Sequence, residues 1–493
     1  MFLSVCLTAY LLALVVVFLF SLVQLQLLYY FIKYQLQPKP TMPILSNICA
    51  ADALPMVTVQ LPIYNELYVV ERLIRAVARL DYPLAKLEIQ ILDDSTDETS
   101  ALIQTVLASL PMEWQGVMRH IQRPDRMGFK AGALAYGLAQ AKGEFIAIFD
   151  ADFVPSVDFL QKTVPYLYES PRVGLVQTRW THLNENFSLL TKIQAFMLDA
   201  HFSIEQLGRN VSGHFINFNG TAGVWRRACI DDAGGWQADT LTEDLDLSYR
   251  AQVRGWHFRY VPQIATPAEL PVLFSAVRSQ QFRWTKGAAE CARKNWGLIW
   301  QTAHLSASVR LHALSHLLNS SVFVAVWVLT VASVGIALAL PSNPDASLIL
   351  GWGRWLSGAL YIVIAFFATA FGWAQGISIT SALRFVGLFP AFLAASYGIA
   401  FHNMIAVCEG FLGVKTPFVR TPKFNTNTQS NKYIVPKLSA WSVVELMLCG
   451  WFLVGLYADW QHGYAALGAM HALAALGYGW VVAMDWRERW AFQ

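Results

Sequence analysis

The sequence predicts a mixed α/β domain, with a mostly parallel sheet and helices on both sides, joined to an α-helical transmembrane region. The chain has 493 residues, of which 55% are hydrophobic and only 14% are charged, whereas an ordinary globular chain is about 25% charged. The excess apolar residues lie at the two ends of the chain, over residues 2–32 and from about residue 310. Between them, short apolar runs alternate with helical patterns, which is typical of parallel sheets.

The N-terminal apolar segment, residues 2–32, ends at Lys33. It is longer than the core of a signal peptide, about 7–15 residues, and no clear A-x-A cleavage site follows it. A membrane span needs about 20 apolar residues. We therefore expect residues 1–33 to be a retained transmembrane anchor, and the proline-containing residues 34–55 to be a linker.

Residues 56–305 carry the α/β pattern and are expected to form one domain. Three strand-like runs stand out: "MVTVQLPIY", "LEIQILDD" and "GEFIAIFDAD". Helical patterns lie between them, for example over Val69–Leu80 and Gly132–Ala141. Ligands of parallel α/β sheets bind beyond the carboxyl ends of the strands. Each run ends on polar residues, so the sequence predicts a functional site at that edge.

Residues 306–493 are predicted to form a C-terminal transmembrane region, with candidate spans at 318–340, 354–375, 438–458 and 463–484. The stretch 385–408 is apolar but contains several polar residues. A basic loop follows at 409–437, and the tail carries Arg487 and Arg489. If 385–408 lies along the membrane interface, loop and tail share the cytoplasmic side with the α/β domain, as the positive-inside rule favours. We predict five crossings and one interfacial helix.

Composition limits the possible functions. The formal net charge of +3 indicates no nucleic-acid partner. The six cysteines contain no C-x-x-C pair, which argues against a zinc site or a disulfide framework.

Two groups of acidic residues follow predicted strands. Asp93 and Asp94 come before a helix, where capping is an equally good explanation. Asp150 and Asp152 form a D-x-D motif, and two carboxylates separated by one small residue point the same way from an extended chain. They can share Mg²⁺ or Mn²⁺, which prefer oxygen ligands, and their mutual repulsion also favours a bound cation.

Two further segments carry candidate site residues. Lys130 precedes a predicted helix, where lysine can hold a diphosphate; a solvated surface lysine is the alternative. Glu243 and Asp244 follow Thr242 in the first turn of another helix, whose dipole stabilises their charged forms. A helix cap needs only one of these three residues, so capping does not explain the cluster. Asp244 is the candidate general base, since a carboxylate ionised at neutral pH can take a proton from a hydroxyl.

The segment "RSQQFRWTKG" contains Gln280, Arg283 and Trp284. Arg283 can bind phosphate through two parallel hydrogen bonds, and Trp284 offers a flat face to a sugar ring. The alternative interpretation is a basic interfacial helix that leads into the membrane.

Together these motifs resemble the processive family 2 glycosyltransferases, and most closely the cellulose synthase-like A and C group of glucomannan and glucan synthases. The order is Asp94, D-x-D at 150–152, T-E-D ending at 244, and Q-x-x-R-W at 280–284. The long matching segments are "LEIQILDDSTDET", "GFKAGAL", "IAIFDADFVPSVDFL", "FNGTAGVWR" and "TEDLDLSYRAQVRGW". Several independent motifs coincide in order over residues 55–295, so chance resemblance is improbable.

The resemblance implies a GT-A-type fold and a role for each matching residue. Asp244 would be the catalytic base, and Asp150 and Asp152 would hold the metal, Mg²⁺ or Mn²⁺. The implied donor-binding residues are Tyr64, Glu66, Asp94, Lys130, Asp150, Gln280 and Arg283. The implied acceptor-binding residues are Asn219, Gly220, Glu243 and Trp284. The loop at 418–423 resembles a gating loop through Phe418, Thr421 and Lys423, although Arg420 replaces the valine of that motif.

The function implied is transfer of a hexose from a nucleotide-sugar, UDP-glucose or GDP-mannose, to a growing β-linked polysaccharide, with possible coupled secretion. The expected partners are the donor, the acceptor and the lipid bilayer. The expected location is a plasma (inner) or Golgi-type membrane, with the catalytic domain in the cytoplasm. Two alternatives remain open: single transfer to a lipid acceptor, and a membrane transporter or scaffold with a catalytically inactive domain.

Overall fold

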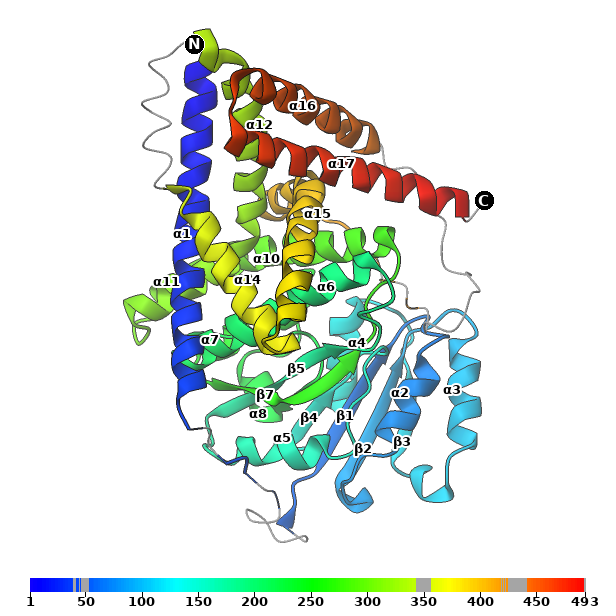
Figure 1. The fold of residues 1–493 in the computed structure, drawn as a ribbon. Helices are drawn as coiled ribbons and strands as arrows, with labels where there is room; N and C mark the ends of the chain where they lie inside the picture. The colour runs from blue at the N-terminus through cyan, green and yellow to red at the C-terminus, as the bar shows by residue number, and fades with distance from the viewer. Residues whose placement is uncertain are drawn as a thin grey trace.

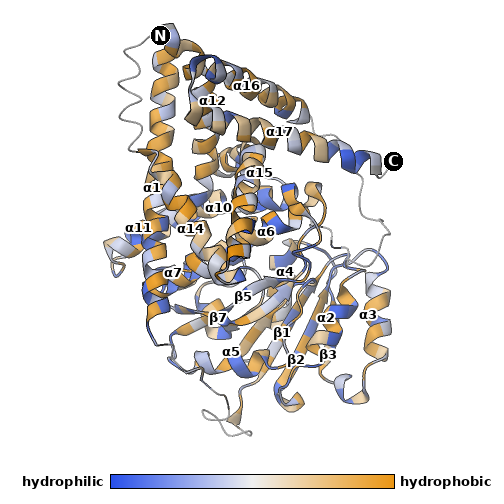
Figure 2. Ribbon diagram, in the orientation of Figure 1, coloured by the Kyte–Doolittle hydropathy of each residue, from blue (hydrophilic) through white to orange (hydrophobic). Residues whose placement is uncertain are grey.

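The computed structural model describes residues 1–38, 41–43, 45, 53–342, 356–417, 419, 421, 423 and 441–491. Figure 1 shows an α/β domain with a layer of long helices above it, so the two predicted parts are both present. Figure 2 shows that hydrophobic residues dominate these helices, while the helices of the α/β domain are mixed.

The α/β domain is built on a seven-stranded sheet with strand order β3-β2-β1-β4-β6-β5-β7. The strands are β1 Val57–Ile63, β2 Leu87–Asp93, β3 Met118–Gln122, β4 Phe145–Ile148, β5 Val173–His182, β6 Gly223–Arg226 and β7 His257–Ala268. Only β6 runs antiparallel to its neighbours, β4 and β5. The prediction of a mostly parallel sheet is confirmed.

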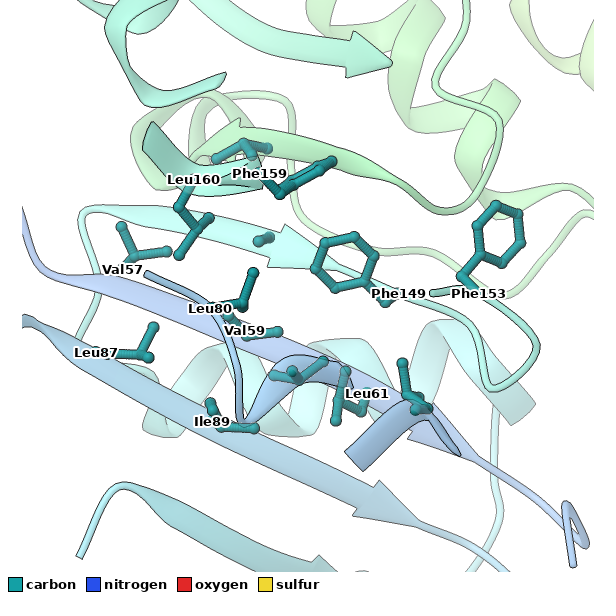
Figure 3. Close-up of a cluster of buried hydrophobic side chains, with 14 of the residues drawn as sticks. Val57, Val59, Leu61, Leu80, Leu87, Ile89, Phe149, Phe153, Phe159 and Leu160 are labelled. Atoms are coloured by element: carbon teal, nitrogen blue, oxygen red, sulfur yellow. The ribbon is translucent and has the colours of Figure 1, made fainter. Parts of the chain in front are cut away.

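The centre of this sheet is buried on both faces, as its continuous apolar runs predicted. Figure 3 shows Val57, Val59, Leu61, Leu87 and Ile89 packed with aromatic side chains. The buried polar residues of β1 bond to β2: Thr58 Oγ1 donates to Glu88 Oε2 over 2.7 Å, and Gln60 Nε2 donates to Gln90 Oε1 over 3.0 Å. The sheet is therefore a rigid support for the residues that follow its strands.

Helices cover both faces of the sheet: α2 Val70–Val77, α3 Thr99–Ala108, α4 Phe129–Gln140, α5 Phe159–Leu167, α8 Arg227–Asp232 and α9 Glu243–Val253. The predicted helix at 69–80 ends earlier, at Val77. The helix predicted from Gly132 begins earlier, at Phe129, because Gly128 takes a left-handed φ of 73° that starts the helix there.

A second set of helices joins the α/β domain to the apolar helices. It consists of α6 Leu189–Ala200, the π-helical turn η5 His201–Glu205, α7 Gln206–Val211, α10 Phe274–Gln301 and α11 Ala307–Leu317. Here α7 lies against α1 Phe2–Leu36 so closely that a Cβ atom on Gly208 would be 2.8 Å from the Leu27 carbonyl oxygen. The N-terminal helix is thus packed onto the α/β domain.

The remaining apolar helices are α12 Val322–Ala339, α14 Ala359–Gln375, α15 Ile379–Leu412, α16 Trp441–His462 and α17 Ala465–Ala491. Within the described residues, five helices are long and apolar enough to cross a membrane: Phe2–Leu36, Asn319–Ala339, Ile379–Leu412, Trp441–His462 and Ala465–Trp490. By length and hydropathy, α15 is a candidate membrane span, whereas α14 is too short to be one. The interfacial position of 385–408 and the domain boundaries stay predictions, and the whole 424–437 part of the basic loop lies outside the described residues.

Close packing of α15 against α17 depends on two glycines. A Cβ atom on Gly477 would be 2.0 Å from the Ala394 carbonyl oxygen, and one on Gly398 would be 2.5 Å from the Gly477 carbonyl oxygen. Nothing lies within 4 Å of such an atom on Gly450, in the middle of α16.

We therefore expect Gly477→Ala to lower the thermal unfolding midpoint of the detergent-purified protein, because overpacking costs about 1–3 kcal/mol. Gly450→Ala is the matched control and should leave the midpoint unchanged or raise it, since alanine favours helix by about 1 kcal/mol. Equal midpoints for the two variants would contradict the close packing of α15 and α17.

Candidate active site

A cavity of about 170 Å³ lies beyond the carboxyl ends of β1, β2 and β4. Its walls also include residues from α4, α9 and α10. The lining contains Tyr64, Glu66, Asp94, Lys130, Asp150, Asp152, Asn219, Gly220, Glu243, Asp244, Gln280, Arg283, Trp284, Thr421 and Lys423. Every predicted site residue therefore meets at one place except Phe418, which lies outside the described residues.

The D-x-D motif forms a turn after β4. The Phe153 N–H donates to the Asp150 carbonyl oxygen over 3.1 Å, so the expected extended chain at this motif is wrong. Each carboxylate nevertheless contacts a lysine ammonium group. Asp150 Oδ1 lies 2.7 Å from Lys130 Nζ, and Asp152 Oδ2 lies 2.7 Å from Lys423 Nζ. Both carboxylates of the motif are thus positions where a cation is stabilised.

Lys130, in the first turn of α4, is a partly buried site residue and not a solvated surface lysine. Its ammonium group donates to the Gly220 carbonyl oxygen over 2.9 Å and lies 3.9 Å from Glu243 Oε1. Burial lowers the pKa of Lys130, but the charges of Asp150 and Glu243 outweigh it, so the pKa is raised overall. Lys130 is a fixed positive charge at the centre of the site.

Asp244 lies in the first turn of α9. Thr242 occupies the N-cap position but its side chain accepts no capping hydrogen bond; instead it contacts Cys291 Sγ at 3.4 Å. Burial, followed by the charge of Glu243, raises the pKa of Asp244 to about 7. The expectation that the helix start alone keeps Asp244 ionised is therefore wrong, because desolvation disfavours the charged form more strongly.

The segment Asn219–Gly220 lies directly between Lys130 and Asp244. Gly220 has a φ of 82°, and a Cβ atom there would be 2.9 Å from Asp244 Oδ2 and 3.3 Å from Lys130 Nζ. A side chain at this position would therefore push apart the carboxyl and the ammonium group, which explains why glycine occupies it.

The residues Gln280, Arg283 and Trp284 share one helix, α10, which is fixed by buried ion pairs. Lys286, fully buried, lies 2.8 Å from Glu409 of α15. Arg278 contacts both Glu445 of α16 and Asp485 of α17 at 2.8 Å. Two of the basic residues of α10 thus bind other helices, and do not face a membrane surface as the alternative required.

The two aspartates after β2 have different roles. Asp93 is buried, and hydrogen bonds from His120 and Ser100 outweigh the effect of burial and lower its pKa. Asp94 forms a two-point ion pair with Arg123, in which Nε lies 2.8 Å from Oδ1 and Nη2 contacts Oδ2. Only Asp94 lines the cavity, so the arginine holds this carboxylate in place there.

Seven lining residues were not identified from the sequence, and Arg126 and Trp180 are the two among them whose side chains carry a charge or an N–H donor. The Arg126 guanidinium lies 3.3 Å from the ring centroid of Tyr64. Trp180 packs edge-on against Phe153, with ring centroids 5.0 Å apart. Arg126 belongs to the same basic segment as Lys130, which was a usable signal, whereas nothing in the sequence around Trp180 indicated a site.

Residues 55–287 match the family model described as "Glycosyltransferase like family 2". These residues form a family 2 glycosyltransferase domain. The resemblance seen in the sequence is thereby confirmed at the level of the domain, and the GT-A-type fold that it implied agrees with the observed sheet.

Sequence relatives of this family 2 domain come from plants. The chain is 39% identical over 370 residues to the probable glucomannan 4-beta-mannosyltransferase 2 of Oryza sativa subsp. japonica, covering 73% of this chain and 60% of that protein. It is 42% identical over 262 residues to the glucomannan 4-beta-mannosyltransferase 7 of Arabidopsis thaliana, covering 52% and 47%. The chain spans about half the length of the curated relatives that it matches.

A solved structure also shares the fold of the family 2 domain. It is a mannosyltransferase from Pyrobaculum calidifontis in complex with GDP-Man and Mn²⁺. The TM-score is 0.52 at 20% identity, and the match covers 82% of this chain and 99% of that one. At this identity the match supports the fold alone.

The Arg123–Asp94 pair gives a testable prediction. Arg123→Met leaves a buried carboxylate without its partner, which costs about 3–5 kcal/mol, so the unfolding midpoint of this variant should fall clearly. The double variant Arg123→Met/Asp94→Asn removes the buried charge and should recover part of the loss. A double variant no more stable than Arg123→Met would contradict this account of the pair.

Proposed function

We propose that this chain transfers a hexose from a nucleotide-sugar to the hydroxyl of a growing β-linked glycan, with inversion at the anomeric carbon. The observation that carries this proposal is the position of Asp244. A partly buried carboxyl with a pKa of about 7 shares one cavity with the D-x-D carboxylates, Lys130 and Arg283. A general base works best when its pKa lies near the operating pH. The names of the plant relatives favour mannose as the transferred sugar and a glucomannan product.

The donor occupies the part of the cavity between β1, β2 and α4. Tyr64, stacked on Arg126, and the fixed carboxylate of Asp94 are placed to contact the nucleoside, with Glu66 beside them. Lys130, Gln280 and Arg283 lie around the D-x-D turn and face the diphosphate. Arginine and lysine are suited to phosphate, the first by paired hydrogen bonds and the second as a compact charge.

The D-x-D carboxylates fit a divalent cation. Mg²⁺ in such sites takes one or two carboxylates and completes its shell with phosphate oxygens and water. Among the described residues no group of three or more His, Cys, Asp or Glu side chains could hold a metal by itself, which agrees with a metal that binds with the donor. When bound to Asp150 and Asp152, Mg²⁺ or Mn²⁺ would neutralise charge on the departing diphosphate.

The reaction is a single displacement. Asp244 takes the proton of the acceptor hydroxyl while the oxygen forms a bond to the anomeric carbon. The bond from that carbon to the diphosphate oxygen breaks, and the nucleoside diphosphate leaves with the electron pair. Lys130 and Arg283 stabilise the negative charge that develops on this group. Attack from the face opposite the leaving group converts an α-linked donor into a β-linked product.

The acceptor has room on the other side of Asp244. A second cavity of about 340 Å³ shares Trp180, Asn219, Asp244 and Trp284 with the first and extends to Phe323 of α12 and Phe366 and Phe367 of α14. Its aromatic and polar walls suit sugar rings, which present apolar faces and hydroxyl edges. Its apolar end, near α12 and α14, favours single transfer to a lipid as the second candidate. A product assay with radiolabelled donor distinguishes the two candidates. Labelled polymer remains at the origin of a chromatogram, whereas a labelled glycolipid partitions into organic solvent.

Asp244 provides the central test. Asp244→Asn should reduce kcat and kcat/KM together by roughly 10²–10⁴-fold while nucleoside diphosphate still binds. Trp284→Ala should instead impair acceptor use. In the wild type, kcat/KM should fall as the pH drops below about 7, because the protonated carboxyl cannot accept the acceptor proton. Near-normal turnover of Asp244→Asn would place the base elsewhere, and Glu243 would be tested next.

The metal gives a separate test. Activity should vanish with chelator and return with Mg²⁺ or Mn²⁺, and Asp152→Ala should weaken donor binding and turnover together. Because the Lys423 ammonium contacts Asp152, Lys423→Met should lower the metal concentration needed for half-maximal binding of nucleoside diphosphate. Lys162→Met, which breaks an exposed pair with Asp158, is the matched control. Full activity in excess chelator would remove the metal from the mechanism.

A further inference from the structure

One wall of the second cavity is formed by α6 and η5, which belong to the continuous helical segment α6–η5–α7. Ala200, His201, Phe202 and Glu205 of this segment all line the cavity. On its other side the same segment is packed against α1 through Gly208. It is therefore held between the candidate acceptor cavity and the N-terminal helix.

The segment is regular except at η5, which is a π-helical turn. The Gln206 N–H donates to the His201 carbonyl oxygen, five residues back. Such turns are rare and occur frequently at functional sites. This one brings His201 and Glu205 together at the cavity, with His201 Nδ1 2.9 Å from Glu205 Oε2.

Glu205 is fixed as a partly buried anion. Arg209, one turn further along, lies 3.6 Å from the same carboxylate oxygen. Burial raises the pKa of Glu205, but the hydrogen bond from His201 and the charge of Arg209 outweigh it and bring the pKa to about 2. The imidazole of His201 is thus oriented by a charged partner that does not move.

The other nitrogen of His201 reaches the segment beside the base. His201 Nε2 lies 3.1 Å from Asn219 Oδ1, which also accepts a hydrogen bond from Asn217 Nδ2 over 3.0 Å. Because Glu205 and Asn219 both present acceptor oxygens, both ring nitrogens of His201 carry a proton when both contacts are hydrogen bonds. The amide of Asn219 is therefore held through its oxygen. The next residue, Gly220, contacts Lys130 and Asp244, so the chain of contacts runs from η5 to the reacting groups.

Among the residues that line the second cavity, Asn219 Nδ2, Asn217 Oδ1 and Trp180 Nε1 have no hydrogen-bond partner within the described part of the chain. Buried polar atoms are nearly always paired in folded proteins, so these three point to a ligand. Two are donors and one is an acceptor. A sugar hydroxyl can both donate and accept, and several hydroxyls on one ring can meet such a mixed set.

We propose that His201 is a positioning residue for the acceptor: held by Glu205, it orients the Asn219 amide to bind a hydroxyl of the terminal acceptor sugar. This inference rests on the proposed function. It names the acceptor as a pyranose bound through its hydroxyls, with Trp284 and Trp180 beside its ring. A lipid alcohol would leave most of these polar atoms unpaired, at a free-energy cost that selects against it.

The test uses the full chain in detergent, the active nucleotide-sugar, and cellohexaose or β-1,4-mannohexaose as acceptor. His201→Ala should raise the acceptor KM roughly tenfold, the order expected when one buried hydrogen bond is lost. Binding of nucleoside diphosphate, and hydrolysis of the donor by water without acceptor, should stay unchanged. His201→Gln, whose amide can still donate toward Asn219, should recover most of the acceptor affinity, whereas the shorter His201→Asn should not.

Two controls separate positioning from a loss of folding. His182 pairs with Asp199 on α6 at 3.2 Å but lines neither cavity, so His182→Gln should keep the wild-type acceptor KM. In a double-mutant cycle of His201→Ala with Asn219→Ala, the combined loss should be smaller than the sum of the single losses, because both act on one contact.

The outcomes distinguish the two levels of proposal. A wild-type enzyme that elongates neither oligosaccharide, but glycosylates a lipid, would overturn the glycan acceptor itself. If the wild type elongates an oligosaccharide, an unchanged acceptor KM in His201→Ala would overturn the role of His201. Strictly additive losses in the cycle would do the same. Equal losses of donor and acceptor binding would assign His201 to the general structure of the site.

Discussion

The ion pair between Lys130 and Asp150 is the contact on which the rest of the site depends. The lysine comes from the start of α4, the aspartate from the turn after β4, and the same ammonium group also binds the Gly220 carbonyl oxygen. Three segments that are distant in the chain are thereby joined around one positive charge. Without that charge, Asp150, Glu243 and Asp244 would repel one another in a poorly solvated cavity.

The balance of charge in this cavity also accounts for the state of Asp244. Glu243 and burial disfavour its anionic form, while Lys130 and Arg283 favour it. A carboxyl balanced in this way can hold a proton or release it near neutral pH. Such a group differs from the aspartates that only support structure: Asp93 has a lowered pKa and is surrounded by hydrogen bonds.

The apolar helices are connected to the two cavities in three places. Helix α10 contributes Gln280, Arg283 and Trp284 to the site and binds α15, α16 and α17 through Lys286 and Arg278. Helices α12 and α14 contribute aromatic side chains to the second cavity. The chain after α15 returns Thr421 and Lys423 to the first cavity. Helix α10 therefore connects the apolar helices directly with the residues of the site.

The sequence by itself determined the α/β class, the order of the motifs and most of the polar residues that line the first cavity. It could do so because motifs at the carboxyl ends of parallel strands must meet at one edge of the sheet. Local conformation was predicted less well, because the D-x-D turn, the unused Thr242 cap and the early start of α4 depend on contacts and dihedral angles that no sequence pattern records.

Only the tertiary structure decided the contacts between residues that are distant in the chain. The contact of Lys423 with Asp152, 271 residues apart, depends on how the apolar helices return the chain to the sheet. The same is true of Trp180 and His201, which come from β5 and η5 and meet residues of α12 and α14 only at the second cavity. The pKa of Asp244 was predicted in the wrong direction because desolvation is a property of the folded surroundings, which the sequence around a residue does not contain.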